Sequence, residues 1–333
     1  MSGAIFMMMA AGGGAEQPID GQTGVWLKSG DVTLSRGMKM TGAVVSSGRK
    51  QFVYSKGEAR YTQCLGVGDV LVSNGGVASN CCISGLSNKG RLLVYAGGTA
   101  VSCVLQSGEI HVNGHPSAAT LVDAVAHGGP VRFQNYANVS NFTISGGTLN
   151  AGEGGGPKRI YGMNVCGGVA NIYGNTVLSG AAVHAGGVLN VSSGGRAVNA
   201  VAPEAGIITA RSGGIISGGS AGGAGYYVAY SGGVLFGIAL SSGGSAFGYG
   251  GGVSGATVGS GARLRLTSSG SFANDIAVER AGYLYVSAGC SASAIVVASN
   301  ANLLVFSGGT ALAVTSNAGA NITVSSGGYI EYA

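Results

Sequence analysis

The segment GGTALAVTSNAGANITVSS (residues 308–326) is the third of three consecutive stretches that share one length and one pattern. GSFANDIAVERAGYLYVSA (270–288) and GCSASAIVVASNANLLVFS (289–307) precede it. Glycine keeps the same 19-residue spacing further back, at Gly194, Gly213, Gly232, Gly251, Gly270, Gly289, Gly308 and Gly327. A fixed period of this length is typical of a solenoid, in which stacked repeats bury a core that no single repeat could form.

Between the glycines, small or branched apolar residues recur two positions apart, as in Ile276 and Val278 or Leu284 and Val286. A spacing of two places both side chains on the same face of a β-strand. The glycines mark the corners, where a left-handed backbone is needed and a Cβ would clash. The sequence therefore predicts an all-β parallel β-helix, a solenoid of about fifteen coils with a 19-residue repeat and one continuous core.

The regularity of the repeat predicts three regions. Residues 156–333 keep the 19-residue period, whereas residues 56–155 keep the composition with looser spacing, which indicates longer corner loops. Residues 1–55 have a poor period and are expected to form an N-terminal arm or cap and irregular first coils. The opening MSGAIFMMMAAGGGA lacks the basic segment of a secretory signal, so we expect an arm rather than a signal peptide.

Composition excludes several classes. Glycine provides 66 of 333 residues without a Gly-X-Y period, which excludes collagen, and 46% hydrophobic residues argue against a disordered linker. The net charge of +5 is modest and its one cluster (Arg49, Lys50, Lys56 and Arg60) fits a solvated rim, so we expect no nucleic-acid partner. No run of 18 apolar residues is present, so no membrane insertion is expected.

The repeats GGVLNVSSGG (186–195), SGGTALAV (307–314) and NITVSSGG (321–328) resemble the AIDA-type repeats of autotransporter adhesin passenger domains. The resemblance covers about residues 56–333. It implies a right-handed β-helix on the cell surface or in the extracellular space that mediates attachment and cell–cell aggregation, with Ser or Thr glycosylated in some members. We see no convincing export signal and no translocator barrel after Ala333, so the alternative is a phage tail-fibre or other structural, receptor-binding component of a virion.

The distribution of acidic residues argues against an enzyme. A polysaccharide lyase or hydrolase built on a β-helix needs clustered carboxylates, yet the acids between residues 156 and 327 are Glu204, Asp275 and Glu279. Glu204 and Glu279 are expected four coils apart, and Asp275 and Glu279 fit a solvated pair on the exposed side of one strand. His111 and His115 flank an Asn-Gly turn and could contact a metal, but an exposed turn is the favoured interpretation. The segment GGGPKR (154–159) resembles a phosphate loop but lacks its Ser/Thr and the helix that follows. We expect no catalytic, cofactor or metal site, and a carbohydrate-active enzyme is the third alternative.

The six cysteines match no metal motif. Cys81 and Cys103 fall at the same inward position of consecutive coils, about 4.8 Å apart, which is within disulfide range. Two buried free thiols fit that geometry equally well and are the favoured interpretation.

The outer side of the second strand of each repeat carries apolar and aromatic residues where Ser, Thr and Asn would be expected. This interaction strip consists of Tyr226, Val228, Tyr230, Phe247, Tyr249, Leu264, Leu266, Tyr283, Tyr285, Leu304 and Phe306. Exposed strips of this kind mark partner sites. A protein partner, including a second copy, a glycan on the tyrosines, or a covering loop or arm of the same chain could occupy it. With the strand edge of GGYIEYA (327–333), the strip predicts self-association into a homo-oligomer or end-to-end assembly, or binding of a surface glycan or protein receptor.

Overall fold

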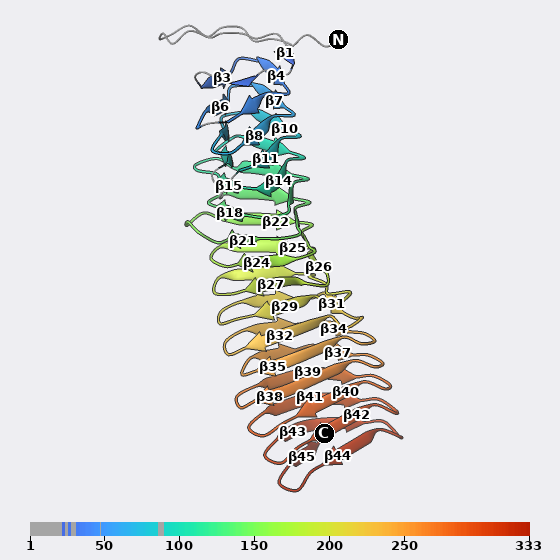
Figure 1. Ribbon diagram of the computed structural model, residues 1–333. Helices are drawn as coiled ribbons and strands as arrows, with labels where there is room; N and C mark the ends of the chain where they lie inside the picture. The colour runs from blue at the N-terminus through green and yellow to red at the C-terminus, as the bar shows by residue number, and fades with distance from the viewer. Residues whose placement is uncertain (1–21, 24–25, 28–30, 47, 86–89) are drawn as a thin grey trace. The chain divides into compact units, whose positions relative to one another are not determined.

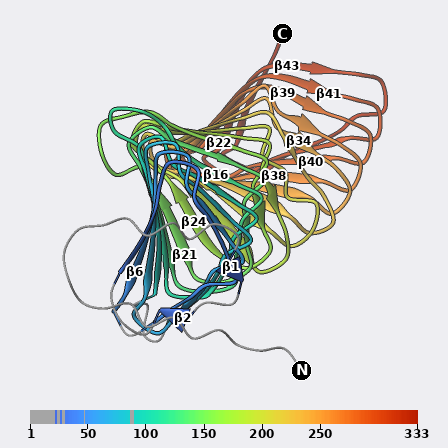
Figure 2. The ribbon, with the colours of Figure 1, turned by 90° about the horizontal axis from the view of Figure 1, so that it is seen from above.

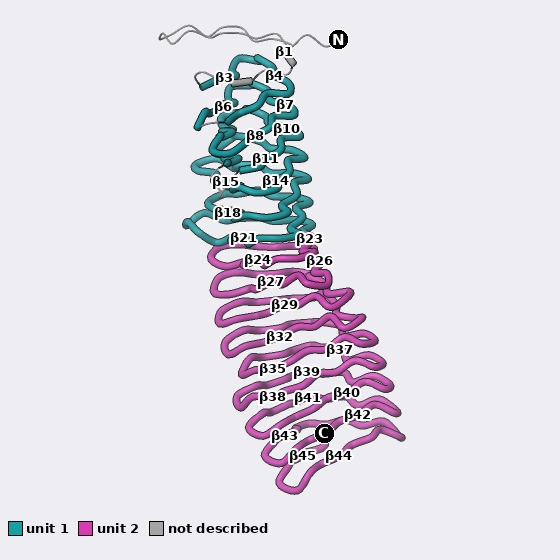
Figure 3. Tube along the Cα trace, in the orientation of Figure 1, with its two compact units in different colours: residues 1–163 teal, residues 164–333 magenta. Residues whose placement is uncertain are grey.

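The computed structural model describes residues 22–23, 26–27, 31–46, 48–85 and 90–333. Every regular element in these ranges is a β-strand, as predicted, and none is a helix that could cross a membrane. The segment MSGAIFMMMAAGGGA, at the start of the predicted arm, lies outside the described residues. Residues 1–163 and 164–333 form two compact units, which Figure 3 colours separately.

In unit 1 each regular coil contributes one strand to each of three parallel faces, rather than the two strands per repeat that the sequence pattern suggested (Figure 1). The first face contains β1 (Gln22–Thr23), β4 (Lys39–Thr41), β7 (Glu58–Arg60), β10 (Val77–Ser79), β13 (Thr99–Val101), β16 (Ala119–Val122), β19 (Ala137–Ser140) and β22 (Lys158–Tyr161). The second contains β2 (Trp26–Leu27), β5 (Val44–Val45), β8 (Gln63–Leu65), β11 (Cys82–Ser84), β14 (Val104–Ser107), β17 (Val125–Ala126) and β20 (Thr143–Ile144). The third contains β3 (Val32–Leu34), β6 (Lys50–Val53), β9 (Asp69–Val72), β12 (Arg91–Tyr95), β15 (Glu109–Asn113), β18 (Pro130–Gln134) and β21 (Thr148–Ala151).

Unit 2 repeats this arrangement and then simplifies it. Its third face contains β24 (Gly168–Ile172), β27 (Gly187–Val191), β29 (Ile207–Ala210), β32 (Tyr226–Tyr230), β35 (Ser245–Tyr249), β38 (Arg263–Ser268), β40 (Tyr283–Val286), β42 (Asn302–Val305) and β44 (Asn321–Val324). The other faces begin with β23 (Asn164–Val165), β25 (Thr176–Ser179), β26 (Ala182–Val183), β28 (Gly195–Val198), β30 (Ile215–Ser217), β31 (Ser220–Ala221), β33 (Val234–Phe236), β34 (Ala239–Leu240), β36 (Gly252–Ser254) and β37 (Thr257–Val258). They end in single longer strands, β39 (Phe272–Val278), β41 (Ser291–Val297) and β43 (Thr310–Ser316), which lie side by side in Figure 2, and in β45 (Tyr329–Tyr332).

The strand β39 shows how two faces become one. It pairs with β36 through Phe272–Asn274 and with β37 through Ala277 and Val278. Counted over both units, the third face has 16 strands among the described residues, which confirms the prediction of about fifteen coils.

The core is a set of apolar ladders that run from coil to coil. Leu189, Val191, Leu284 and Val286 are fully buried, as the period of two predicted. Val324 follows the same period of two but is 39% exposed. It continues the ladder of Val305, and β44 pairs with β42 alone, so no further strand of the described chain covers it.

One interior position carries a compensating pair. Gly219 stands where neighbouring coils have Ala200 and Ile238, both buried. The side chain of Tyr227 fills that place, because a Cβ on Gly219 would lie 2.8 Å from its hydroxyl oxygen. The hydroxyl donates a hydrogen bond of 2.5 Å to the carbonyl of Ala200, and burial raises the pKa of Tyr227.

A left-handed residue marks the corner between the first and second faces of each coil. In unit 2 this column contains Gly180, Asn199, Gly218, Gly237, Gly255, Asp275, Ala294 and Ala313, with φ between 48° and 69°. Asn and Asp tolerate this conformation better than other non-glycine residues. Asp275 therefore has a structural place at a corner.

The paired glycines at the other turns have two different physical roles. Gly232 has φ +73°, so it adopts the left-handed backbone that was predicted. Gly233 has no positive φ, but a Cβ there would lie 2.3 Å from the carbonyl oxygen of Ala210 in the preceding coil. The first glycine is required by conformation and the second by lack of space.

Within unit 2 the register departs from 19 residues at one coil. The left-handed turn glycine that corresponds to Gly232 is Gly250, with φ +81°, and not Gly251, as the even spacing suggested. The third face shows the same change, since Ser245 pairs with Arg263, 18 residues on, and Arg263 pairs with Tyr283, 20 residues on. A bulge between Gly248 and Tyr249 in the pairing of β35 with β38 accompanies the change.

The cysteines are free thiols, as favoured from the sequence. Cys81 and Cys103 are buried at equivalent inward positions, and a hydrogen bond between the thiols together with burial raises the pKa of Cys81. Burial likewise raises the pKa of Cys64 to about 12, and its thiol donates a hydrogen bond of 2.6 Å to the carbonyl of Gly68.

The two glycine roles predict losses of stability of different size on substitution. Gly232→Asn should lower the free energy of unfolding by less than about 1 kcal/mol, because Asn tolerates a left-handed backbone. Gly233→Asn should lower it by about 1–3 kcal/mol or more, because its Cβ meets a backbone carbonyl. Urea unfolding followed by circular dichroism measures both, and equal losses would contradict the separation of roles.

The Cys64 thiol predicts a loss of stability in alkali. Its pKa is about 12 in the folded chain and about 9 when unfolded. The folded state therefore keeps a proton that the unfolded state releases. Stability is unaffected below about pH 9 and falls as pH rises towards 12, by up to about 1.4 kcal/mol per pH unit for this group. Cys64→Ala should flatten the decline of stability measured by chemical denaturation between pH 9 and 11. Cys166→Ala, at an exposed cysteine, should leave it unchanged.

Candidate functional site

The interaction strip lies on the outer side of the third face of unit 2, on β32, β35, β38, β40 and β42. Parallel pairing in register aligns its side chains into columns, because residues opposite each other in adjacent parallel strands point to the same side. One column contains Val228, Phe247, Arg265, Tyr285 and Leu304. At roughly 4.8 Å per strand, the five strands present a surface roughly 20 Å long.

Aromatic rings of β32 and β35 form the first cluster of the strip. Tyr226 meets Phe247 edge-on at 5.9 Å between ring centroids, and Tyr249 stacks on Phe247 at 6.1 Å and on Tyr230 at 5.7 Å. The guanidinium of Arg211, which follows β29, lies 5.2 Å from the centroid of the Tyr230 ring. Tyr230 and Tyr249 are about 40% exposed, so the cluster is accessible at its edge.

A second cluster lies on β40 and directly after β42. The rings of Tyr283 and Tyr285 stack at 6.0 Å, and those of Tyr285 and Phe306 at 6.4 Å. The guanidinium of Arg265 in β38 lies 5.0 Å from the centroid of Tyr285. Phe306 is 41% exposed and Leu304 is half-buried.

The prediction that Leu264 and Leu266 belong to the strip is wrong. Both side chains are fully buried in the core, and Arg263 and Arg265 point outward in their place. The reason is the 18-residue step between Ser245 and Arg263, which shifts the alternation of β38 by one residue relative to the 19-residue period.

Val228 points outward as predicted but is only 5% exposed. Its outer neighbours along the strand are Tyr226 and Tyr230, and its partner in the next strand is Phe247. These larger side chains surround it, so Val228 is the floor of the first cluster rather than part of its accessible surface.

The arginines of the strip were missed from the sequence, although a signal was present. The even period would have placed Arg263 and Arg265 at inward positions, where an unpaired guanidinium is unfavourable. Arg263 and Arg265 are the charged residues in the five strands that carry the strip. The Nε atom of Arg265 is buried without a hydrogen-bond partner among the described residues. The strip is therefore aromatic with a positive centre, which suits binding rather than bond cleavage.

The acids considered for catalysis occupy three different places in the fold. Glu204, Asp275 and Glu279 are exposed, and they lie in a turn, at a corner and after the end of β39. His111 contacts the Gln134 carboxamide oxygen at 2.9 Å through Nε2, and the His115 ring lies 6.1 Å from that of Tyr136. In the described part of the chain, no three His, Cys, Asp or Glu residues form a group that could hold a metal ion.

The lysine of the GGGPKR segment is hydrogen-bonded to the loop that precedes it. Lys158 is fully buried, and its Nζ donates hydrogen bonds to the carbonyl oxygens of Gly152, Glu153 and Gly154 at 3.0–3.2 Å. Burial lowers the pKa of this lysine. Its donors serve the loop that precedes β22, so they hold the loop in place instead of facing a phosphate.

This arrangement predicts a structural role for Lys158. Lys158→Met should destabilise the chain by about 1–3 kcal/mol in urea unfolding, because three carbonyls lose their donor. Arg159→Met, at the exposed next residue, should have little effect. A rise in melting temperature with inorganic phosphate that Lys158→Met abolishes would contradict this role.

Comparison with known proteins supports the fold. No protein-family model matches the chain, and no curated protein matches it. Among solved structures, the chain is similar to the crystal structure of a fragment of TibA hyper-glycosylated in a TibC-catalysed reaction. The TM-score is 0.62 and the sequence identity 24%, with 94% of this chain and 98% of that chain covered. The similarity shows a shared solenoid fold, in agreement with the architecture that the AIDA-type repeats imply.

Proposed function

We propose that the chain is a non-catalytic surface adhesin of the autotransporter passenger type that associates with copies of itself through the interaction strip. Its place of action is the cell surface or the extracellular space. The observation that carries the proposal is the strip itself, two aromatic clusters with Arg265 between them on one face of unit 2.

The composition of the strip supports a protein partner. Tyrosine and arginine are enriched among the residues that dominate binding energy at protein interfaces. Several rings are already held against each other, so binding would immobilise few new rotamers. Strips on two copies could meet edge to edge, with ring edges and guanidinium groups of one copy against ring faces of the other.

The non-catalytic part of the proposal rests on the placement of the acids. Glycoside cleavage needs two carboxyl groups within about 10 Å on either side of one bond. Glu204, Asp275 and Glu279 instead occupy exposed sites in a turn, at a corner and after the end of β39. The alternative of a virion component shares the fold and the strip, and imaging where the protein resides in its native source distinguishes the two.

Light scattering tests self-association through the strip. Tyr230, Tyr249, Tyr285 and Phe306 changed together to Ser should shift the chain towards monomer, with the dissociation constant raised more than about 30-fold. The far-ultraviolet circular dichroism spectrum should be unchanged, because these side chains point away from the core.

The matched control changes four exposed apolar residues on the other face of unit 2 to Ser: Ile215, Phe236, Phe272 and Val296. This variant should associate like the wild type. A wild type that stays monomeric at high concentration would rule out self-association, and an oligomer that survives the strip changes but not the control changes would assign the contact to the other face.

A second candidate function, as an acceptor of covalent sugars, has its own observation. In six turns of unit 2 the residue before the left-handed glycine is an exposed serine, and these serines form a column: Ser193, Ser212, Ser231, Ser269, Ser307 and Ser326. The similar TibA fragment is described as hyper-glycosylated. Mass spectrometry of the chain from its native source should then find sugar on peptides that contain these serines, and unmodified peptides would reject this function.

A further inference from the structure

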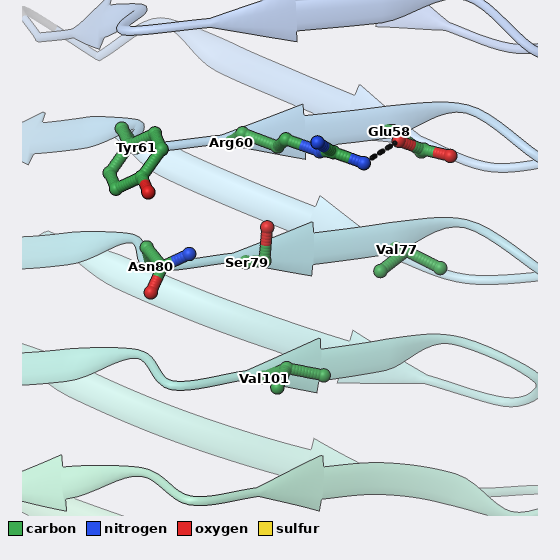
Figure 4. A pocket seen from close by; sticks show the side chains of 7 residues that line it. All are labelled: Glu58, Arg60, Tyr61, Val77, Ser79, Asn80 and Val101. Atoms are coloured by element: carbon green, nitrogen blue, oxygen red, sulfur yellow. Dashed lines mark hydrogen bonds and ion pairs between the residues drawn. The ribbon is translucent and has the colours of Figure 1, made fainter.

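A shallow groove crosses the outer side of the first face of unit 1, remote from the serine column and the interaction strip in sequence. It has a volume of about 380 Å³, which is within the range of roughly 300–1,000 Å³ for small-molecule sites. Side chains of β7, β10 and β13 and of the corners after β7 and β10 line it (Figure 4).

The groove arises from a step in side-chain size between coils. Glu58 pairs with Val77, and Arg60 pairs with Ser79, which pairs in turn with Val101. The long side chains of β7 therefore form one wall, and the short side chains of β10 and β13 form the floor. Figure 4 shows Arg60 and Glu58 along one strand with Val77 and Val101 on the strands below.

Tyr61 at the end of this wall is a conformational outlier. It occupies the left-handed corner position, with φ 54°, where other coils of unit 1 have Gly42, Asn80, Ser102, Asp123, Asn141 and Gly162. A bulky residue in this conformation is strained, and such strain is found where the side chain has a function. The Tyr61 side chain contributes little to packing, because it is 59% exposed. Its ring borders the groove.

The wall carries a net positive charge. The Glu58 carboxylate forms ion pairs with Lys39 Nζ at 3.3 Å and with Arg60 Nη2 at 2.8 Å, so two cations share one anion. Burial alone raises the pKa of the Glu58 carboxyl, but the hydrogen bonds and charges of Lys39 and Arg60 outweigh it and lower the pKa. The carboxylate thus stays ionised and holds the guanidinium in place, while Arg60 has further N–H donors that can face the groove.

These features select one ligand chemistry. An exposed aromatic ring and an apolar floor suit the C–H face of a sugar ring, and the Asn80 carboxamide at the corner suits its hydroxyl groups. A guanidinium fixed at the rim suits a carboxylate, with which it forms charge-assisted hydrogen bonds. We propose that the groove between Tyr61, Arg60 and Val101 binds a saccharide that carries a carboxylate, such as a uronic acid.

Ligand-observed NMR titration of the full chain with glucuronate and with glucose tests this site. Glucuronate should bind about tenfold more tightly than glucose, the difference expected for one charge-assisted pair. Arg60→Gln should reduce the affinity for glucuronate to that for glucose. Tyr61→Asn should weaken both sugars about tenfold while the melting temperature stays the same or rises, because Asn relieves the left-handed strain.

Tyr161→Ser is the matched control, since this tyrosine is also exposed on the first face of unit 1; the variant should bind like the wild type. Absence of glucuronate binding to the wild type would overturn the proposal, as would unchanged binding by Tyr61→Asn. Displacement of glucuronate by an equal concentration of acetate would also overturn it, because it would show a site for a simple anion. The light-scattering result for the interaction strip does not bear on any of these outcomes.

Discussion

The backbone ladder between successive coils is the constraint on which the structure depends. Parallel strands lie about 4.8 Å apart, so each turn and each inward side chain must fit within that distance of the coil before it. The Cβ that is absent from Gly233 would lie 2.3 Å from the Ala210 carbonyl oxygen, which shows how close the turns are. The same spacing explains why small and branched residues dominate the interior. Tyr227, the largest of the fully buried side chains described, fits because Gly219 leaves room for it.

Given this ladder, a change in coil length is the simplest way to alter the surface without altering the core. The 18-residue step before β38 and the 20-residue step after it keep Leu264 and Leu266 in the apolar interior. They also present Arg265 between two groups of aromatic rings, where an unbroken 19-residue period would have presented leucine. The groove on unit 1 has a similar origin, because it results from a change in the size of outward side chains while the inward alanines, Ala59, Ala78 and Ala100, stay constant.

The sequence predicted the coil because period, glycine and alternation all reflect the ladder. The sequence could not show which of Gly250, Gly251 and Gly252 takes the turn position. With three glycines in a row, a shift of the repeat by one residue leaves the glycine pattern unchanged. The arginines of ARLRLT (262–267) carried that information, because the even period placed them inside an apolar core. The groove could not be predicted from the sequence. It depends on the left-handed backbone of Tyr61 and on the ion pairs of Glu58 with Lys39 of the preceding coil and Arg60 of its own strand.

Reactivity of single cysteines placed along β38 tests the account most directly, because the phase of this strand decides which side chains form the strip. In a background with Cys82 and Cys166 changed to Ser, cysteine is substituted in turn at Arg263, Leu264, Arg265 and Leu266, and the rate of reaction with a thiol reagent is measured on the folded chain. The structure predicts fast reaction at positions 263 and 265 and slow reaction at 264 and 266. The opposite alternation would restore the even 19-residue phase and would contradict the composition of the interaction strip described above.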